Sequence, residues 1–407
     1  MAKAIRMTLM TYLNPETKRF YRRVFDNFQK KYGVEVRLNR VSWGKAFSYL
    51  VESFKNESGP DVFQLGTTWV ETFAHLGYLM EKPAYLERPP LTEWMARDCQ
   101  YKGREMAVPW NIHVKALMAK KKLLKEHDIG FVDIKDRSNF LKLCQKLKQK
   151  RNNNSQIPYP LIFPLKTNKT TLHLFTAWLY ASGLEFPEID PVPDRILGSE
   201  PFVKTFCSLI ELINAYSFRE EKMVHQKHSY ELYRNFADGF QYIFYLGTWE
   251  ISSRREDWQE RDYTLFPIPG TSADRKTKGG GSVLGVSAET DFPHLSWKLI
   301  EELTAAEVLD GWIRTSGFIP GFETDIWEKR NDEQMMLRAY NDIRRSCEFP
   351  HHPLWGKIEN ILTKGITDYM WFLLENKSAQ KNIDGEHPII RKADKKIKRL
   401  LKLSWDF

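Results

Sequence analysis

Strand-like and helix-like segments alternate along the first fifth of this chain, and that alternation limits the fold more than any other feature. Strand-like segments show apolar residues at every second position or in short apolar runs, whereas helical segments repeat them about every four residues. The expected elements are a strand at 4–12, a helix at 15–32, a strand at 34–38, a helix at 47–54, a strand at 61–66 and a helix at 70–79. This order predicts a doubly wound α/β sheet.

The loops that follow these strands share one edge of the predicted sheet. In open α/β sheets, ligands bind outside the carboxyl ends of the strands. The stretch "GPDVFQLGTTW" ends a strand in small polar residues beside a tryptophan, and Tyr12 and Trp43 follow the two preceding strands. We therefore expect a polar ligand with an apolar face to lie across this edge.

Composition favours a binding surface rich in flat rings. Of the 407 residues, 14% are aromatic, with 13 Trp and 17 Tyr, which suits sugar stacking as well as an aromatic-rich core. The formal net charge of +9 would attract acidic ligands or anionic surfaces, but we find no nucleic-acid-reading module and expect no nucleic-acid partner. The four cysteines lie far apart and show neither metal-ligand spacing nor a disulfide framework.

The remainder of the chain crosses between two predicted lobes. "AVPWN" at 107–111 leads into a helix-rich stretch from about 112 to 250, "FPIPG" at 266–270 precedes a glycine-rich turn that feeds another strand, and "SGFIPG" at 316–321 makes a third crossing. The last part reads as helices, with an apolar stripe at Ile390, Ala393, Ile397 and Leu401. Several crossings favour two hinged lobes over two independent domains.

The order of these segments resembles the extracellular solute-binding proteins of bacterial ABC importers, the branch that includes maltose-binding protein. The matching pieces are "GPDVFQLGTTWVETFAHLGYL", "AVPWNIHVKALMAKKKLLKEHDI", "TAWLYASGLEF", "FADGFQYIFYLGTWEI", "LFPIPG", "GGGSVLGVSAE" and "GFIPG". The resemblance implies a periplasmic-binding-protein type II fold with a hinged cleft, in which each lobe is a doubly wound mixed sheet with flanking helices. We place the first lobe at 1–109 plus 267–316 and the second at 110–266 plus 317–407.

The resemblance also implies a function. It predicts a carbohydrate, an oligosaccharide or related polar solute, as ligand, an ABC permease at the membrane as partner, no cofactor and a monomeric protein. We expect no enzymatic activity, because the chain lacks a nucleophile elbow, a P-loop and a His-Glu-x-x-His helix. The expected location is periplasmic or extracellular and membrane-associated after removal of a leader, or cytoplasmic if the chain starts natively at Met1.

Twelve residues are candidate ligand contacts. They are Tyr12, Trp43, Gln64, Thr67, Thr68, Trp69, Trp110, Asn111, Trp249, Gly280, Gly281 and Trp355. An indole ring covers the apolar face of a pyranose, while amides and hydroxyls pair with its hydroxyl groups. The resemblance places Trp249, in "YLGTWEI", where the family presents a ring to sugar, and the alternative is a core tryptophan at a strand end.

Several of the other candidates also have a structural alternative. Trp69 and Trp355 suit helix packing, one of the two threonines suits capping of the next helix, and Trp110 with Asn111 suits packing at the hinge. The glycine run at 279–281 suits either a turn or close approach to a ligand. Lys276 and Lys278 before it raise the idea of an anionic sugar, against the alternative of ordinary exposed lysines.

A second function remains open at this point. The same binding unit would serve as an intracellular carbohydrate sensor that controls a regulator through lobe closure. The upstream coding sequence would separate the two, because a hydrophobic leader supports import. A glycan-processing enzyme is a third class, and turnover of an oligosaccharide would reveal it.

Overall fold

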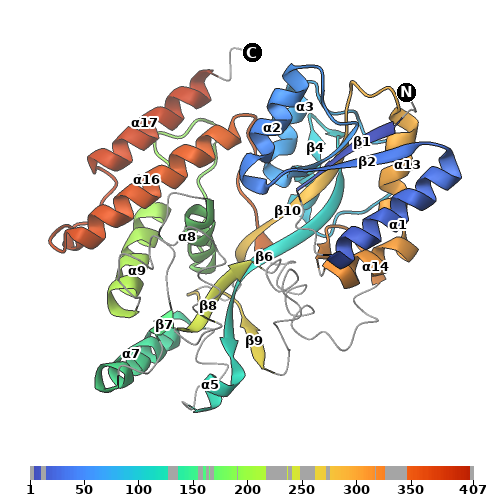
Figure 1. Ribbon diagram of the computed structural model, residues 1–407. Helices are drawn as coiled ribbons and strands as arrows, with labels where there is room; N and C mark the ends of the chain where they lie inside the picture. Colours follow the sequence, from blue (N-terminus) through green and yellow to red (C-terminus); the bar gives the residue numbers. More distant parts are fainter. Residues whose placement is uncertain are drawn as a thin grey trace.

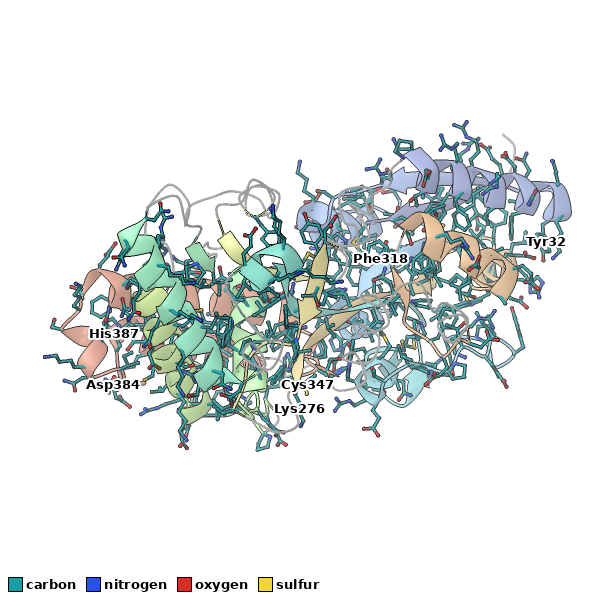
Figure 2. All side chains as sticks on the ribbon, turned by 90° about the horizontal axis from the view of Figure 1, so that it is seen from below. Tyr32, Lys276, Phe318, Cys347, Asp384 and His387 are labelled. Atoms are coloured by element: carbon teal, nitrogen blue, oxygen red, sulfur yellow. The ribbon has the colours of Figure 1, made fainter. Side chains whose placement is uncertain are left out.

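The computed structural model describes residues 4–10, 15–126, 136–154, 159–161, 165, 169–189, 191–216, 236, 241–247, 262–271, 276–316, 318–325 and 346–403. Two groups of helices stand on either side of a shared, elongated sheet (Figure 1). Viewed from below, Lys276 and Cys347 lie between the groups, with Tyr32 and Asp384 toward opposite ends (Figure 2). The fold is the predicted two-lobed α/β architecture.

The first lobe contains the predicted alternation of strands and helices. Strand β1 (Ala4–Leu9) pairs in parallel with β2 (Glu35–Arg40) and β3 (Val62–Gly66). The helices of this lobe are α1 (Pro15–Tyr32), α2 (Trp43–Lys55), the 3₁₀ turn η1 (Thr67–Trp69), α3 (Val70–His75), α4 (Glu93–Asp98), α13 (Pro293–Leu303) and α14 (Ala306–Ser316). Gly33, at φ 72°, follows the end of α1 in the left-handed conformation that glycine adopts without strain.

The second lobe is dominated by helices. Its described elements are α5 (Lys121–Glu126), α7 (Arg137–Asn153), β7 (Tyr159–Leu161), α8 (Lys169–Ala181), α9 (Glu200–Tyr216), β8 (Gln241–Gly247), β9 (Tyr263–Phe266), α16 (Trp355–Glu375), η3 (Ala379–Lys381) and α17 (Pro388–Leu403). The predicted stripe of α17, from Ile390 to Leu401, is buried in this lobe, where α17 packs against α16. The expectation of an amphipathic terminal helix is confirmed.

Two long strands join the lobes. They are β6 (Val108–Lys120) and β10 (Thr277–Val286), which pair antiparallel, and the sheet order is β2-β1-β3-β10-β6-β8-β7. Short strands β11 (Ile319–Pro320) and β12 (Ser346–Cys347) add to β6 and β10, and β4 (Gln100–Tyr101) forms a separate hairpin with β5 (Arg104–Glu105). Each lobe has its own apolar core, and β6 contributes Val114 to the first and Leu117 to the second. The residue boundaries of the lobes remain a prediction.

Two sequence expectations at this junction are wrong. The helix-rich stretch expected from about residue 112 begins instead with strand, because β6 continues to Lys120 with almost all of its residues buried between its partner strands. The glycine run at 279–281 is not a turn before a strand, since it lies inside β10 opposite residues 112–114 of β6. In both cases, pairing with strands distant in the sequence determines the secondary structure.

No described helix combines the length and the apolar character that crossing a bilayer requires.

Gly281 tests the close packing of β10 on β6. A Cβ at this position would lie 2.2 Å from the Asn111 carbonyl oxygen and 3.0 Å from the Met95 methyl group. We expect Gly281→Ala to lower the free energy of unfolding by about 2 kcal/mol or more through overpacking, measured by urea denaturation. The matched control is Gly44→Ala at an exposed position of α2, where nothing lies within 4 Å. This control should be neutral or stabilising, and equal losses in both variants would contradict the packing argument.

Candidate functional site

The rim formed by the ends of β2 and β3 brings two predicted site residues together. Trp43 begins α2 just after β2, and Trp69 lies in η1 just after β3. Their ring centroids are 5.6 Å apart at an interplanar angle of 61°, and Phe47 supports Trp69 at 5.3 Å. Trp43 is 43% exposed, whereas Trp69 is 4% exposed. The Trp43 indole is thus open to solvent and packs against the buried Trp69 indole.

Gly66, the last residue of β3, makes room for this pair. A Cβ there would lie 3.3 Å from the Trp69 ring and 3.5 Å from the Trp43 ring. The glycine in "QLGTTW" therefore lets both rings rest on the strand end.

The polar residues beside this rim are engaged within the protein. Gln64 accepts a hydrogen bond from the Met10 amide and donates to the Ser282 hydroxyl, both at 2.8 Å, which ties β1, β3 and β10 together. Thr67 donates to the Glu348 carboxylate at 3.5 Å. The capping alternative for the threonines is wrong, because the cap residues of η1 and α3 are Gly66 and Trp69, without a side-chain cap bond.

Residues 346–353 lie between the two lobes, and we call them the bridging segment. On the first lobe, the Trp94 indole donates to the Ser346 hydroxyl at 3.0 Å and the Thr72 hydroxyl donates to the Pro353 carbonyl at 2.6 Å. On the second lobe, the Tyr180 hydroxyl donates to the Glu348 carbonyl at 2.7 Å. The bridging segment is thus held from both sides.

A buried ion pair lies at the centre of this junction. Lys278 of β10 pairs with Glu348, with both side chains at most 3% exposed, and the Lys278 ammonium lies 4.2 Å from the Phe349 ring centroid. Burial raises the pKa of Glu348, although the charge of Lys278 opposes that shift. The reading of Lys278 as an exposed lysine is wrong. Lys276, by contrast, is partly exposed and pairs with Glu185 at 3.4 Å.

A second ion pair joins the bridging segment to the first lobe. His351 Nε2 lies 2.7 Å from Asp98 Oδ1, and the Asp98 side chain is 1% exposed. Burial lowers the pKa of His351, but the hydrogen bond and charge of Asp98, with the charge of Glu71, outweigh burial and raise it above its usual value. The neighbouring carboxylates therefore favour the charged form of the imidazole at the lobe junction.

Of the remaining candidates, some are buried and two lie outside the residues that the structure describes. Trp110 is fully buried, with its ring centroid 4.2 Å from that of Trp312, and Trp355 is fully buried with its centroid 5.0 Å from that of Phe349. Both arrangements match the packing alternatives. Asn111 is 3% exposed on β6. Tyr12 and Trp249 lie outside the described residues.

Gly280 belongs to the buried junction as well. A Cβ on Gly280 would lie 2.9 Å from His113 Nε2 and 3.3 Å from Glu348 Oε2. Gly281 faces the Asn111 backbone instead. Both glycines are thus explained by close packing within the protein, and their contact with a ligand remains a prediction.

The space left between the rim and the bridging segment is small. A pocket of about 10 Å³ is lined by Thr67, Thr68, Glu71, Asp98, Phe349, Pro350 and His351. That volume suits about one water molecule, whereas sites for small organic ligands measure several hundred cubic ångströms. A saccharide at this place would require the bridging segment and the rim to separate.

Sequence reasoning missed the polar residues of this junction. Glu348, Asp98 and His351 were not candidates. Their roles depend on contacts between residues 70 or more positions apart, such as Glu348 with Lys278. The available signal was the dense polar and aromatic run "CEFPHHPLW".

Comparison with known proteins identifies relatives of this chain. The family model described as bacterial extracellular solute-binding protein matches residues 23–324. The diacetylchitobiose binding protein DasA of Streptomyces coelicolor is 23% identical over 88% of this chain and 84% of that protein. The maltotriose-binding protein of Pyrococcus abyssi is 23% identical over 76% of this chain and 66% of that protein.

Solved structures share the fold at low sequence identity. An ABC transporter solute-binding protein from Thermotoga lettingae, bound with α-D-tagatose, aligns with a TM-score of 0.80 at 17% identity, covering 98% of this chain and 100% of that one. The GacH receptor of Streptomyces glaucescens, solved unliganded and with acarbose, aligns over all of both chains with a TM-score of 0.77 at 18% identity.

The His351–Asp98 pair makes a pH-dependent contribution to stability. Because the folded-state pKa of His351 is raised, the contribution is complete below the unfolded pKa of about 6.5 and is lost as pH rises through the folded pKa. We expect the stability difference between wild type and His351→Gln to shrink as pH rises from about 6 to 9. Urea unfolding across this range measures it.

The control for this measurement is His294→Gln, which replaces an exposed histidine on α13. Any change of stability with pH that both variants share does not come from the contact with Asp98. A His351→Gln difference that stays level, or that grows with pH, would contradict a raised pKa of His351 at the junction. Arg97 and Glu71 also face this group.

Proposed function

This chain belongs to the bacterial extracellular solute-binding proteins, and from that membership we propose that it binds an oligosaccharide between its two lobes for an ABC importer. The names of DasA and of the Pyrococcus protein point to diacetylchitobiose and maltotriose, and GacH was solved with acarbose. All three ligands are short oligosaccharides or their analogues. We propose the same class of ligand here and leave its stereochemistry open.

The exposed Trp43 ring carries this proposal. A polar surface would normally bury or omit a ring of this size, yet Trp43 is 43% exposed and is supported from below by Trp69. Such a platform is complementary to the apolar face of a pyranose. The predicted ring of Trp249 would approach from the other lobe, and that contact remains a prediction.

Binding would couple to the angle between the lobes. A ligand at Trp43 has to share space with the bridging segment and with Lys169 of α8, whose ammonium lies 5.5 Å from the Trp69 ring centroid. Opening of the lobes would therefore break contacts between them, and contacts with the ligand would replace these. A ligand that favours one lobe arrangement shifts the population toward it.

We further propose that the protein catalyses no covalent reaction, that it acts outside the cytoplasm and that it is a monomer. The relatives named above are binding proteins and a receptor, and one structural neighbour is described as the solute-binding part of an ABC transporter. None of these descriptions is of a sensor, so transport is the function we propose. A membrane permease would receive the loaded protein.

Trp43→Ala tests the platform. We expect wild type to bind at least one of maltose, maltotriose, acarbose and diacetylchitobiose in isothermal titration calorimetry. The variant should raise the dissociation constant about tenfold, which corresponds to about 1.4 kcal/mol, and Trp43→Phe should lose less. The control is Tyr85→Ala, which removes another exposed ring, 53% exposed. Equal affinity of Trp43→Ala and wild type would remove Trp43 from the site.

Thr72→Val tests competition between the bridging segment and ligand. This isosteric change deletes the 2.6 Å hydrogen bond to Pro353, worth about 1 kcal/mol. We expect oligosaccharide binding to tighten about fivefold in isothermal titration calorimetry, because about 1 kcal/mol less is needed to open the lobes. The control is Ser48→Ala on exposed α2. Weaker binding by Thr72→Val would instead mean that the bridging segment closes over the ligand.

A further inference from the structure

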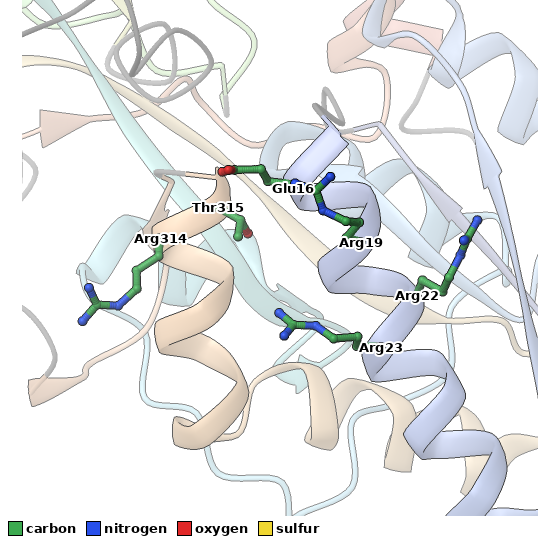
Figure 3. A pocket seen from close by; sticks show the side chains of 6 residues that line it. All are labelled: Glu16, Arg19, Arg22, Arg23, Arg314 and Thr315. Atoms are coloured by element: carbon green, nitrogen blue, oxygen red, sulfur yellow. The ribbon is translucent and has the colours of Figure 1, made fainter.

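A groove on the first lobe, between α1 and α14, gathers positive charge. It encloses about 490 Å³ and is lined by Glu16, Arg19, Arg22, Arg23, Arg314 and Thr315 (Figure 3). Both helices belong to the first core and neither contributes to the junction described above. The groove is therefore a separate feature from the candidate saccharide site.

Three of its arginines have no partner among the residues that the structure describes. Arg19, Arg22 and Arg23 are exposed on successive turns of α1, and among the described residues none of them makes a hydrogen bond or an ion pair. Some other exposed arginines are paired, as in the contacts of Arg37 with Glu35 and of Arg104 with Glu81. The groove thus has three unpaired guanidinium groups on neighbouring turns of one helix.

The walls of the groove are fixed by buried contacts. The Thr17 hydroxyl donates to the Thr315 carbonyl at 3.0 Å, and the Trp312 indole donates to the Tyr21 hydroxyl at 3.0 Å. Gly311 allows close approach, because a Cβ there would lie 3.2 Å from the Phe20 ring. The spacing between α1 and α14 is consequently set before any ligand arrives, which reduces the entropy lost on binding.

The charges at the groove do not balance. Arg19 and Arg23 are one helical turn apart and lie on one face of α1, and in Figure 3 the Arg23 side chain extends toward α14. Arg314 adds a fourth guanidinium, which pairs with Asp310 at 2.7 Å. Glu16 is the acidic residue among the lining side chains. Three unpaired cations beside one carboxylate leave a net positive site that an anion would stabilise.

We propose that this groove binds a phosphoryl group. Guanidinium groups form paired hydrogen bonds with phosphate oxygens, and these charge-assisted bonds are stronger than neutral ones. A tetrahedral phosphoryl group directs oxygens toward several guanidinium groups at once, whereas a planar carboxylate is satisfied by a single arginine fork. The source is either a soluble phosphate compound or the headgroup of an anionic lipid. The site does not depend on the proposed saccharide function.

Titration of the full chain with inorganic pyrophosphate tests the site. In calorimetry at low salt, wild type should bind, and the double variant Arg19→Gln/Arg23→Gln should bind at least tenfold more weakly. The matched control, Arg40→Gln/Lys45→Gln, removes two exposed cations of the same lobe and should retain the wild-type affinity. Arg19→Lys/Arg23→Lys keeps the charge but loses the planar fork, so it should fall between wild type and the Gln variant.

Vesicles identify the source of the phosphoryl group. If it is a lipid headgroup, wild type should co-sediment with vesicles containing phosphatidylglycerol and not with pure phosphatidylcholine, and the Arg19/Arg23 Gln variant should lose this binding. Binding of pyrophosphate without vesicle binding would assign a soluble phosphate compound.

Three outcomes would overturn the proposal. They are no pyrophosphate binding by wild type, equal losses in the groove and control variants, and tighter binding of an oligoglutamate peptide than of pyrophosphate. The last would assign the groove to an acidic protein segment instead. Circular dichroism and melting temperature establish that each variant is folded. All four replaced side chains, of Arg19, Arg23, Arg40 and Lys45, are exposed. Loss of folding would therefore not explain weaker pyrophosphate binding by the Arg19/Arg23 variant alone.

Discussion

The close approach of β10 to β6 is the constraint on which the arrangement of the two lobes depends. Gly281 brings the two backbones together where a methyl group would meet the Asn111 carbonyl at 2.2 Å. On its other edge β10 pairs with β3 of the first lobe, while β6 continues into pairs with β8 and β9 of the second. Because the ladder is continuous, the lobes are restricted to bending and twisting about this pair of strands.

The same approach creates a polar junction beside the strands. Lys278 and Glu348 are buried together, and an isolated charge at that depth would be strongly disfavoured. Such a pair adds little stability compared with apolar packing, but it fixes the position of the bridging segment because each charge requires the other. The segment in turn orders Phe349 against Trp355 and His351 against Asp98. Electrostatics thus selects one register for the segment between the lobes.

Local sequence patterns predicted the rim but not the junction. Parallel strands end at one edge, so the alternation alone indicated that Trp43 and Trp69 would meet, and their rings are 5.6 Å apart. The apolar stripe of α17 was equally readable from helical periodicity. By contrast, the length of β6, the placement of three glycines inside β10 and the role of Glu348 follow from pairing between distant segments. The sequence left the roles of Trp110 and Trp355 open, because a tryptophan at such a position suits either the core or a ligand contact.

The junction also sets the energetic scale of lobe opening. Separation of the first lobe from the bridging segment breaks the contacts of Thr72, Trp94 and Asp98. At about 1 kcal/mol for each polar contact, the closed arrangement would be favoured by roughly 3 kcal/mol, so about one molecule in a hundred would be open without ligand. A ligand that needs the open arrangement would bind about a hundredfold more weakly than to a preformed cleft. If the ligand is an oligosaccharide, as proposed above, the closed junction favours longer chains, because each further sugar ring adds apolar area and hydrogen bonds without adding to the opening cost.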